Sequence, residues 1–234
     1  MAEVYWDMEW KLQQQGFDYT YDKSLYDRLL HGDVGRVNGH LTAGMDYQRH
    51  LVRFIENHDE RRAAEAFGIE RSKAAAALAL TLPGLRLVHE GQMEGRQAKL
   101  PVHLGRRRQE VPVDGLESFY RRLLAAVSHP VFHDGEWKLL KAGPVSAGNP
   151  GYLQAVCHQW VLGEERRIVA ANLSDRPAQF FLPVEMPQLT GQNCRLCDLL
   201  NDERYARSGD DMLGQGVYVD LPAYDAHVFD VKTE

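Results

Sequence analysis

Hydrophobic and polar residues follow two different patterns along the chain, and the change falls near residue 130. Before that point, short apolar runs are separated by segments in which apolar residues recur at helical spacing. After it, runs with strand-like patterning dominate. The order strand, helix, strand, helix in the first part predicts a parallel sheet covered by helices.

In the first part, the apolar face at 116–127 is the clearest helix signal, because its large apolar residues recur three and four positions apart. The alanine-rich segment 70–82 is also expected to be helical, ending at Pro83 and Gly84. A helix over 8–15 and another beginning at a Ser24 cap complete this set. The expected strands are 2–6, 17–21, 51–57 and 85–88, the last of them buried.

The second part is predicted to be a small β-sandwich, with turn-rich segments between its strands. Its expected strands are 136–140, 153–162, 167–173, 179–184, 194–199, 216–221 and 227–231. We therefore expect two domains, at 1–130 and 131–234.

Composition narrows the classes of partner. The chain has 234 residues, of which 44% are hydrophobic, and a formal net charge of −6, which disfavours nucleic acid because no basic surplus neutralises phosphates. No run is long and apolar enough for a membrane helix, and the first residues do not have the pattern of a signal peptide. Cys194 and Cys197 form a C-x-x-C without a second ligand pair, so structural thiols in a reducing, cytoplasmic setting are expected.

Three clusters of polar residues stand at or just after expected strands: 2–6, 56–60 and 89–92. In a parallel barrel, the carboxyl ends of the strands carry the catalytic side chains. The structural alternative is that each acid caps the next helix, as Asp59 and Glu60 would for 61–67. Spacing alone leaves both interpretations open.

These clusters carry a resemblance to a known family. The segment 54–59, FIENHD, resembles the seventh-strand motif of the α-amylase superfamily (glycoside hydrolase family thirteen), and 2–6, AEVYW, is similar to its fifth-strand motif. The segments 82–84 and 87–95, LPG and LVHEGQMEG, resemble the eighth strand and its loop, and 119–124, FYRRLL, resembles the last barrel helix. The motifs occur in the order of that family and span almost the whole chain.

The resemblance implies a fold class and a set of roles. The fold would be α/β: the second half of a (β/α)8 TIM barrel (strands 5–8) followed by an all-β sandwich. Glu3 would be the general acid/base, Asp59 the carboxylate that stabilises the transition state, and His58 a ligand of the sugar hydroxyls, with Asn57 also in the substrate site. Tyr5 and Trp6 either stack on sugar faces or serve as packing residues.

The implied function is retaining hydrolysis of α-glucans or maltooligosaccharides, with no metal and no other cofactor. The family's nucleophilic aspartate belongs to the fourth strand, and this chain starts at the fifth. We therefore expect a fragment, from a truncated or split gene, that is inactive alone and that pairs with the missing N-terminal barrel half or self-associates through exposed sheet edges. The alternative is a non-catalytic sugar-binding or assembly protein of the same fold, although Glu3, His58 and Asp59 are all present.

Overall fold

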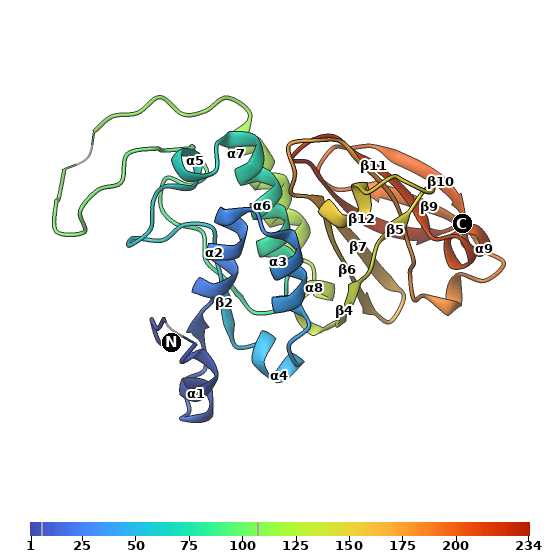
Figure 1. Cartoon of the computed structure of the whole chain (residues 1–234), viewed down its shortest axis with the longest axis horizontal. Helices are drawn as coiled ribbons and strands as arrows, with labels where there is room; N and C mark the ends of the chain where they lie inside the picture. The colour runs from blue at the N-terminus through green and yellow to red at the C-terminus, as the bar shows by residue number, and fades with distance from the viewer. Residues whose placement is uncertain (6, 107) are drawn as a thin grey trace. The chain divides into compact units, whose positions relative to one another are not determined.

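The computed structural model describes residues 1–5, 7–106 and 108–234, and has the mixed α/β class that the sequence predicted (Figure 1). The chain divides into two compact units, Met1–Arg121 and Arg122–Glu234. The dividing line falls inside α7 (Leu116–Val127), the helix whose apolar face was the clearest signal in the sequence. None of the helices among the described residues has the length and apolar character needed to cross a bilayer.

The first unit is built on a short parallel sheet. Its strands are β1 (Thr20–Tyr21), β2 (Leu51–Arg53) and β3 (Leu85–Arg86), in the order β1-β2-β3. Both pairings are parallel, with Thr20 opposite Leu51 and Val52 opposite Leu85. Ala2 adds a further parallel bridge to Thr20. Segments 2, 20–21, 51–53 and 85–86 therefore run side by side in chain order.

Helices connect these strands. Helix α6 (Ile69–Thr81) confirms the alanine-rich prediction, and α1 (Glu9–Gln14) confirms the helix expected at 8–15. Helix α2 (Lys23–His31) is capped by Asp22, whose side chain accepts a hydrogen bond from the amide of Leu25, so the Ser24 cap was wrong. The other described helices between these strands are α3 (Val34–Leu41), α4 (Met45–Gln48) and α5 (Ala63–Ala66), whereas α8 (Val131–Asp134) belongs to the second unit.

The strands of this unit are shorter than predicted. The strand expected at 51–57 ends at Arg53, although Phe54–Asn57 stays buried. The strand expected at 85–88 ends at Arg86, and Leu85 is 41% exposed, so the prediction of a buried strand there was wrong. A parallel strand forms only where a neighbour offers backbone partners. Here the chain leaves the sheet early and forms the loops that carry the polar clusters.

The buried side chain of Arg53 links strand β2 to neighbouring segments of the first unit. This side chain is fully buried, and its guanidinium donates to Asp22, to Gln48 and, at 2.8 Å, to the carbonyl of Pro83. His40 Nε2 lies 2.9 Å from the other oxygen of Asp22. Burial alone would raise the pKa of Asp22, but Arg53 and His40 together hold it below its ordinary value. This network ties β2 to the segments before α2 and after α6.

The second unit consists of two antiparallel sheets. The larger has the order β10-β9-β12-β7-β6-β4, and the smaller the order β11-β8-β5. The strands of the larger sheet are β4 (Glu136–Leu140), β6 (Ala155–Leu162), β7 (Glu165–Asn172), β9 (Asn193–Asp198), β10 (Arg204–Ser208) and β12 (Ala226–Thr233). The smaller sheet contains β5 (Gly143–Pro144), β8 (Ala178–Leu182) and β11 (Val217–Leu221).

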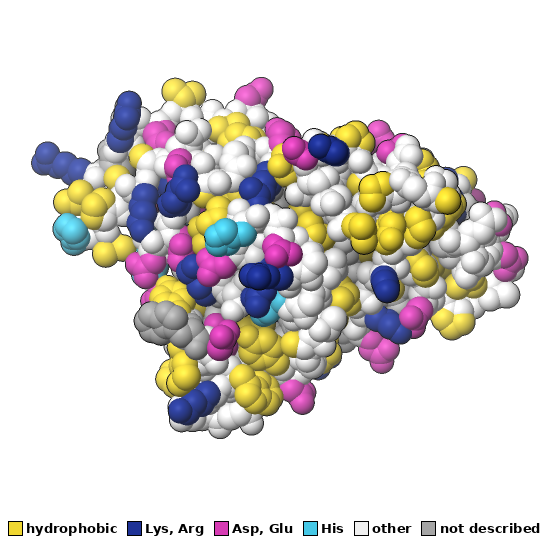
Figure 2. Space-filling view, in the orientation of Figure 1, with side chains coloured by type: hydrophobic (Ala, Val, Ile, Leu, Met, Phe, Trp, Pro, Cys, Tyr) yellow, Lys and Arg dark blue, Asp and Glu magenta, His cyan; other side chains and the backbone are white. Residues whose placement is uncertain are grey.

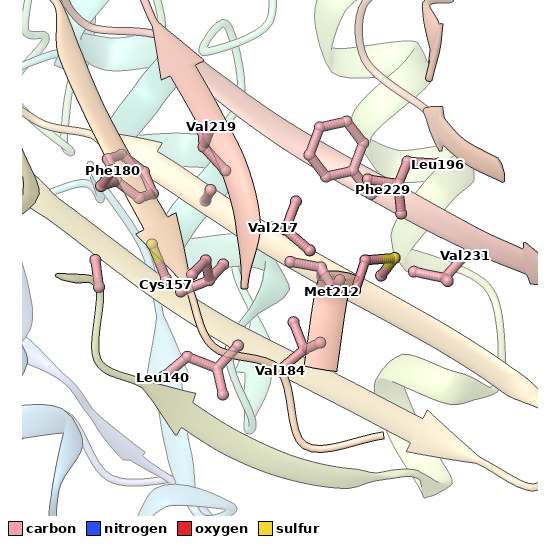
Figure 3. Packing of buried hydrophobic residues seen from close by; sticks show 14 of the residues in the cluster. Leu140, Cys157, Phe180, Val184, Leu196, Met212, Val217, Val219, Phe229 and Val231 are labelled. Atoms are coloured by element: carbon pink, nitrogen blue, oxygen red, sulfur yellow. The ribbon is translucent and has the colours of Figure 1, made fainter. Parts of the chain in front are cut away.

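The core of this unit lies between the two sheets. Cys157, Leu196 and Phe229 come from the larger sheet, Phe180 and Val219 from the smaller one, and all are buried. Figure 3 shows these side chains directed toward one another, together with Met212 of α9 (Gly209–Gly214). Alternate residues of each strand contribute to this core, because successive side chains of a strand point to opposite faces.

The strand predictions in this unit were largely confirmed, with two omissions. Residue patterns did not predict β10, a polar edge strand with no fully buried residue, or β5, a two-residue strand that ends in proline. The start of the expected strand at 153–162 is a 3-10 turn, η1 (Gly151–Gln154), and a second such turn is η2 (Pro187–Leu189). All three cysteines are free thiols, and Cys194 is buried whereas Cys197 is half-buried, as expected for a strand.

Candidate active site

Glu3, His58 and Asp59 come together in the first unit, although Glu3 lies far from the other two in sequence. His58 Nε2 is 3.5 Å from Glu3 Oε1 and 3.5 Å from Asp59 Oδ1. The side chains are exposed by 38%, 42% and 52% for Glu3, His58 and Asp59, respectively. The parallel arrangement explains the meeting, because the segments after Ala2 and β2 leave the sheet at the same end.

Tyr5 bridges the two carboxylates. Its hydroxyl donates to Glu3 Oε1 at 3.3 Å and reaches Asp59 Oδ2 at 3.5 Å. Burial, and then the charges of Glu3 and Asp59, raise the pKa of Tyr5. The phenol therefore stays protonated and acts as a hydrogen-bond donor at neutral pH. Trp6, predicted beside it in the substrate site, lies outside the described residues.

Asn57 shapes the loop that carries His58 and Asp59. Its Oδ1 accepts hydrogen bonds from the amides of Asp59 and Glu60, both at 2.9 Å. Asn57 is 1% exposed, and its Nδ2 has no hydrogen-bond partner among the described residues. The side-chain oxygen of Asn57 thus stabilises the conformation of the loop, whereas its amide nitrogen makes no hydrogen bond within the described residues.

Glu56 was quoted in the sequence motif but given no role, and the structure makes it the centre of a buried network. It has no solvent exposure. Its Oε2 accepts from the amide of Ala63 at 2.5 Å, and its Oε1 lies 3.1 Å from Arg62 Nη2 and 3.0 Å from His89 Nδ1. Burial raises the pKa of Glu56 to about 7, although the Ala63 amide and Arg62 partly oppose the shift.

The contacts of Glu56 also bear on the alternative that Asp59 and Glu60 cap the following helix. Helix α5 begins at Ala63, and the amide of Ala63 donates to Glu56 rather than to Asp59 or Glu60. Asp59 and Glu60 are therefore not required to start that helix. The signal that could have identified Glu56 was its position inside an apolar run, where a carboxylate needs a dedicated partner.

The third polar cluster, at 89–92, is attached to the second through Arg62. Arg62 Nη1 lies 2.8 Å from His89 Nδ1, and Nη2 donates to the carbonyl of Glu90 at 2.7 Å. Burial, followed by the charge of Arg62, lowers the pKa of His89. Gln92 accepts from the amide of His89 at 3.1 Å and donates to the Tyr120 hydroxyl at 2.9 Å. Gly91, at a φ of +85°, leaves room for Arg62, because a Cβ there would lie 2.7 Å from its Nη2.

An open cleft of about 180 Å³ adjoins the Asn57–His58 loop and the 89–92 cluster. Lys99 lines it and also donates to the carbonyl of Asp59. Figure 2 shows Lys and Arg side chains interspersed with Asp and Glu on the face of the molecule that it presents. Among the described residues, the charged lining of the cleft consists of four basic side chains, Arg62, Arg96, Lys99 and Arg108, and two acidic ones, Glu90 and Glu110.

Glu3, His58 and Asp59 can also place one ligand atom each within 4.8 Å of one another, as a divalent metal would require. All three side chains are exposed, and exposed acidic groups often lie this close without a metal. We therefore interpret the cluster as a pair of carboxylates rather than as a metal site, and the expectation that it works without a metal stays a prediction.

Comparisons with known sequences and solved structures test the family resemblance. No protein-family profile matches the chain. The α-amylase MalA of Haloarcula japonica is 32% identical over 91 residues, which cover 36% of this chain and 14% of that protein. The maltogenic α-amylase AmyB of Thermotoga neapolitana superimposes with a TM-score of 0.73 at 18% identity, over 97% of this chain and 53% of that one. The resemblance to the α-amylase superfamily is confirmed.

A second solved α-amylase, that of Geobacillus thermoleovorans in complex with acarbose, superimposes with a TM-score of 0.74 at 15% identity. It is matched over 98% of this chain and 52% of its own length. The chain therefore spans about half the length of the solved enzymes whose fold it shares.

Proposed function

We propose that the chain is the acid/base-bearing half of a retaining α-glucan hydrolase. The observation that carries this proposal is the meeting of Glu3, His58 and Asp59 within hydrogen-bonding range, from segments that are remote in sequence. Two carboxylates flanking one bond are the usual equipment of glycoside hydrolysis. The names of the related proteins support α-glucans as the substrate class.

In this proposal, Glu3 protonates the departing glycosidic oxygen. His58, beside both carboxylates, donates to sugar hydroxyls, and Asp59 stays ionised and stabilises the positive charge that develops on the sugar ring. The Tyr5 hydroxyl lies within hydrogen-bonding distance of both carboxylates and so holds them close to each other. Asn57 fixes the loop, because its Oδ1 accepts hydrogen bonds from the amides of Asp59 and Glu60.

The nucleophile is proposed to come from outside this chain. Retaining hydrolysis needs a carboxylate about 5 Å from the acid, on the opposite side of the scissile bond. By resemblance to the family, that residue belongs to a strand preceding the segment of Ala2. The chain would then be strands 5–8 of a TIM barrel with a C-terminal β-sandwich, and its partner the other barrel half. The coverage of about half of each solved α-amylase supports this assignment.

The alternative is a sugar-binding or assembly protein that keeps the fold without the chemistry. The intact set of Glu3, His58 and Asp59 favours the hydrolase, because glycoside hydrolysis requires carboxylates whereas sugar binding can do without them. A complementation experiment separates the two: the chain is co-expressed with, or fused to, an N-terminal half barrel from a complete α-amylase such as MalA.

Hydrolysis of maltooligosaccharides that appears only in the combined protein, and that is lost in Glu3→Gln, would support the proposal. Turnover by the 234-residue chain alone would contradict its status as one half of the enzyme. Turnover by the combined protein that survives Glu3→Gln would contradict the acid/base role. Where the two halves fail to assemble, maltotriose-induced NMR shifts at His58 in the chain alone, abolished in Asp59→Ala, provide a second readout.

A further inference from the structure

The second unit has a cleft of its own, far in sequence from the proposed catalytic residues. It opens between β10 and β11, the edge strands of the larger and smaller sheets, and has a volume of about 140 Å³. Leu196, Val219 and Phe229 form its apolar floor, where the core of the unit reaches the surface. The cleft is open and smaller than the roughly 300–1,000 Å³ of enclosing pockets, so it suits one sugar ring of a longer ligand rather than a whole small molecule.

His227 provides a fixed polar group in this cleft. Its Nδ1 lies 2.7 Å from Asp198 Oδ2, and Asp198 also accepts from the amide of Leu200 at 3.0 Å and from Asn201 Nδ2 at 2.7 Å. Burial raises the pKa of Asp198, but His227 and these donors together hold it below its ordinary value. Because Nδ1 of His227 is engaged by Asp198, Nε2 is the ring nitrogen left for a hydrogen bond with a ligand hydroxyl.

Aromatic rings flank this histidine. His227 is stacked on Phe229 at 4.7 Å between ring centroids, and Tyr205 meets Phe229 edge-on at 5.9 Å. Arg207 lies over the Tyr205 ring at 5.5 Å. Tyr205 and Arg207 both line the cleft, so a ligand there would meet a ring and several planar N–H donors together.

The rim on the β11 side has a second aromatic surface. Tyr218 is 40% exposed and packs edge-on against its cross-strand partner Phe181 at 5.8 Å. The next outward pair on these strands is Asp220 and Gln179, joined by a hydrogen bond of 2.9 Å. An exposed ring beside a carboxylate and an amide can bind a sugar. The aromatic ring packs against the apolar face of the sugar, and the polar groups form hydrogen bonds with its hydroxyl groups.

We propose that this β10–β11 cleft, with Tyr218 at its rim, binds an α-glucan chain as a second, non-catalytic site. One glucose ring would enter the cleft and bond to His227 and Arg207, and the next would stack on Tyr218 with its hydroxyls toward Asp220. The ligand class follows the proposed function, but the site uses none of its residues. Such a site would raise the local concentration of polymeric substrate around the enzyme.

The test is a titration of the 234-residue chain with maltotriose, followed by calorimetry and by NMR saturation transfer, with cellotriose as the stereochemical control. We expect Tyr218→Ala to weaken maltotriose binding by about tenfold, because the stacking surface is lost. Tyr218→Phe should bind like the original chain, and His227→Gln should bind more weakly. Trp10→Ala, which removes another exposed aromatic side chain (47%) in the first unit, is the matched control and should bind normally.

The partly exposed position of Tyr218 means that Tyr218→Ala should melt at the same temperature as the original chain, so weaker binding would not reflect unfolding. Equal binding of maltotriose and cellotriose, or unchanged binding in both Tyr218→Ala and His227→Gln, would overturn the inference. Loss of binding in Glu3→Gln and Asp59→Asn instead would place the sugar at the proposed catalytic site. A combined enzyme that hydrolyses glucans while Tyr218→Ala has no effect on binding would leave the proposed function standing without this second site.

Discussion

His89 Nδ1 lies 3.0 Å from Oε1 of Glu56, and this contact joins the loop after β2 to the loop after β3. Glu56 is wholly buried, whereas the side chain of His89 is 27% exposed. Arg62 touches both, so three side chains from three segments share one small polar interior. The protonation of this interior affects how stable the first unit is.

Glu56 should make stability fall as the pH rises from about 4.5 to about 7. Its pKa is about 7 when folded and 4.5 as the ordinary value, so the folded chain holds a proton in this window that the unfolded chain has released. Unfolding stability then declines with pH, by up to about 3 kcal/mol, and levels off above the folded pKa. Urea unfolding of Glu56→Gln between pH 4.5 and 8 should lack this component.

The exposed helix residue Glu70 provides the control for that series, and Glu70→Gln should keep the pH dependence of the original chain. An unchanged pH slope in Glu56→Gln would show that the buried carboxylate is ionised throughout.

Removing Asp22 should destabilise the chain severely. Asp22→Ala leaves the fully buried guanidinium of Arg53 without its anion, which typically costs about 3–5 kcal/mol. The matched control is Glu65→Ala, which breaks the exposed pair with Arg61 and should change the urea midpoint far less, because solvent screens that pair. Urea midpoints at pH 7 compare the two; similar losses would mean that the burial of the pair is not what matters.

The two proposed catalytic carboxylates should respond differently to the leaving group. In a reconstituted enzyme, Glu3→Gln should slow hydrolysis of unactivated glucans by about a hundredfold or more, yet spare aryl glycosides whose leaving group departs without protonation. Asp59→Asn should slow both, because charge stabilisation is needed in every glycosyl transfer step. Steady-state rates on maltotriose and an activated aryl maltoside measure this, and equal losses on both substrates for Glu3→Gln would exclude its role as the acid.

The chain alone should self-associate. Strand β3 is the edge of the parallel sheet, and its Leu85 is 41% exposed, so backbone groups and apolar surface are both available to another chain. Sedimentation velocity should show dimers or larger species, and Leu85→Lys should shift the population toward monomer, since edge lysines oppose pairing. A monomer that melts cooperatively at high concentration would count against an incomplete sheet.

Much of the fold could be predicted from residue patterns, because strong periodicity survives tertiary context. The apolar face of α7 and the alternation in β11 are examples in which one face is buried and the other solvated. The pattern does not contain the information for β10, whose pairing with β9 depends on backbone groups and not on apolar side chains. Likewise, the Asp22 cap of α2 depends on Arg53, a partner that only the folded chain brings near.

For the candidate site, sequence motifs pointed to Glu3, His58 and Asp59, and the structure brings these residues together. The motifs did not indicate why the loop holds its shape. The bonds from Asn57 to two amides, and from Glu56 to Ala63, are contacts within a few residues that no periodicity reports. The position of Glu56 in an apolar run indicates that it needs a partner, but only the structure shows that Arg62 and His89 provide it.

Those same short-range bonds bear on how two barrel halves would combine. Because Asn57 and Glu56 fold the His58–Asp59 loop from within this chain, that loop is ordered before any partner arrives. Association of the two halves would then be a single bimolecular step, with a rate that rises in proportion to the concentration of the partner. No slow first-order phase of loop ordering would follow it. Enzyme activity would therefore appear at the same rate as the two halves associate.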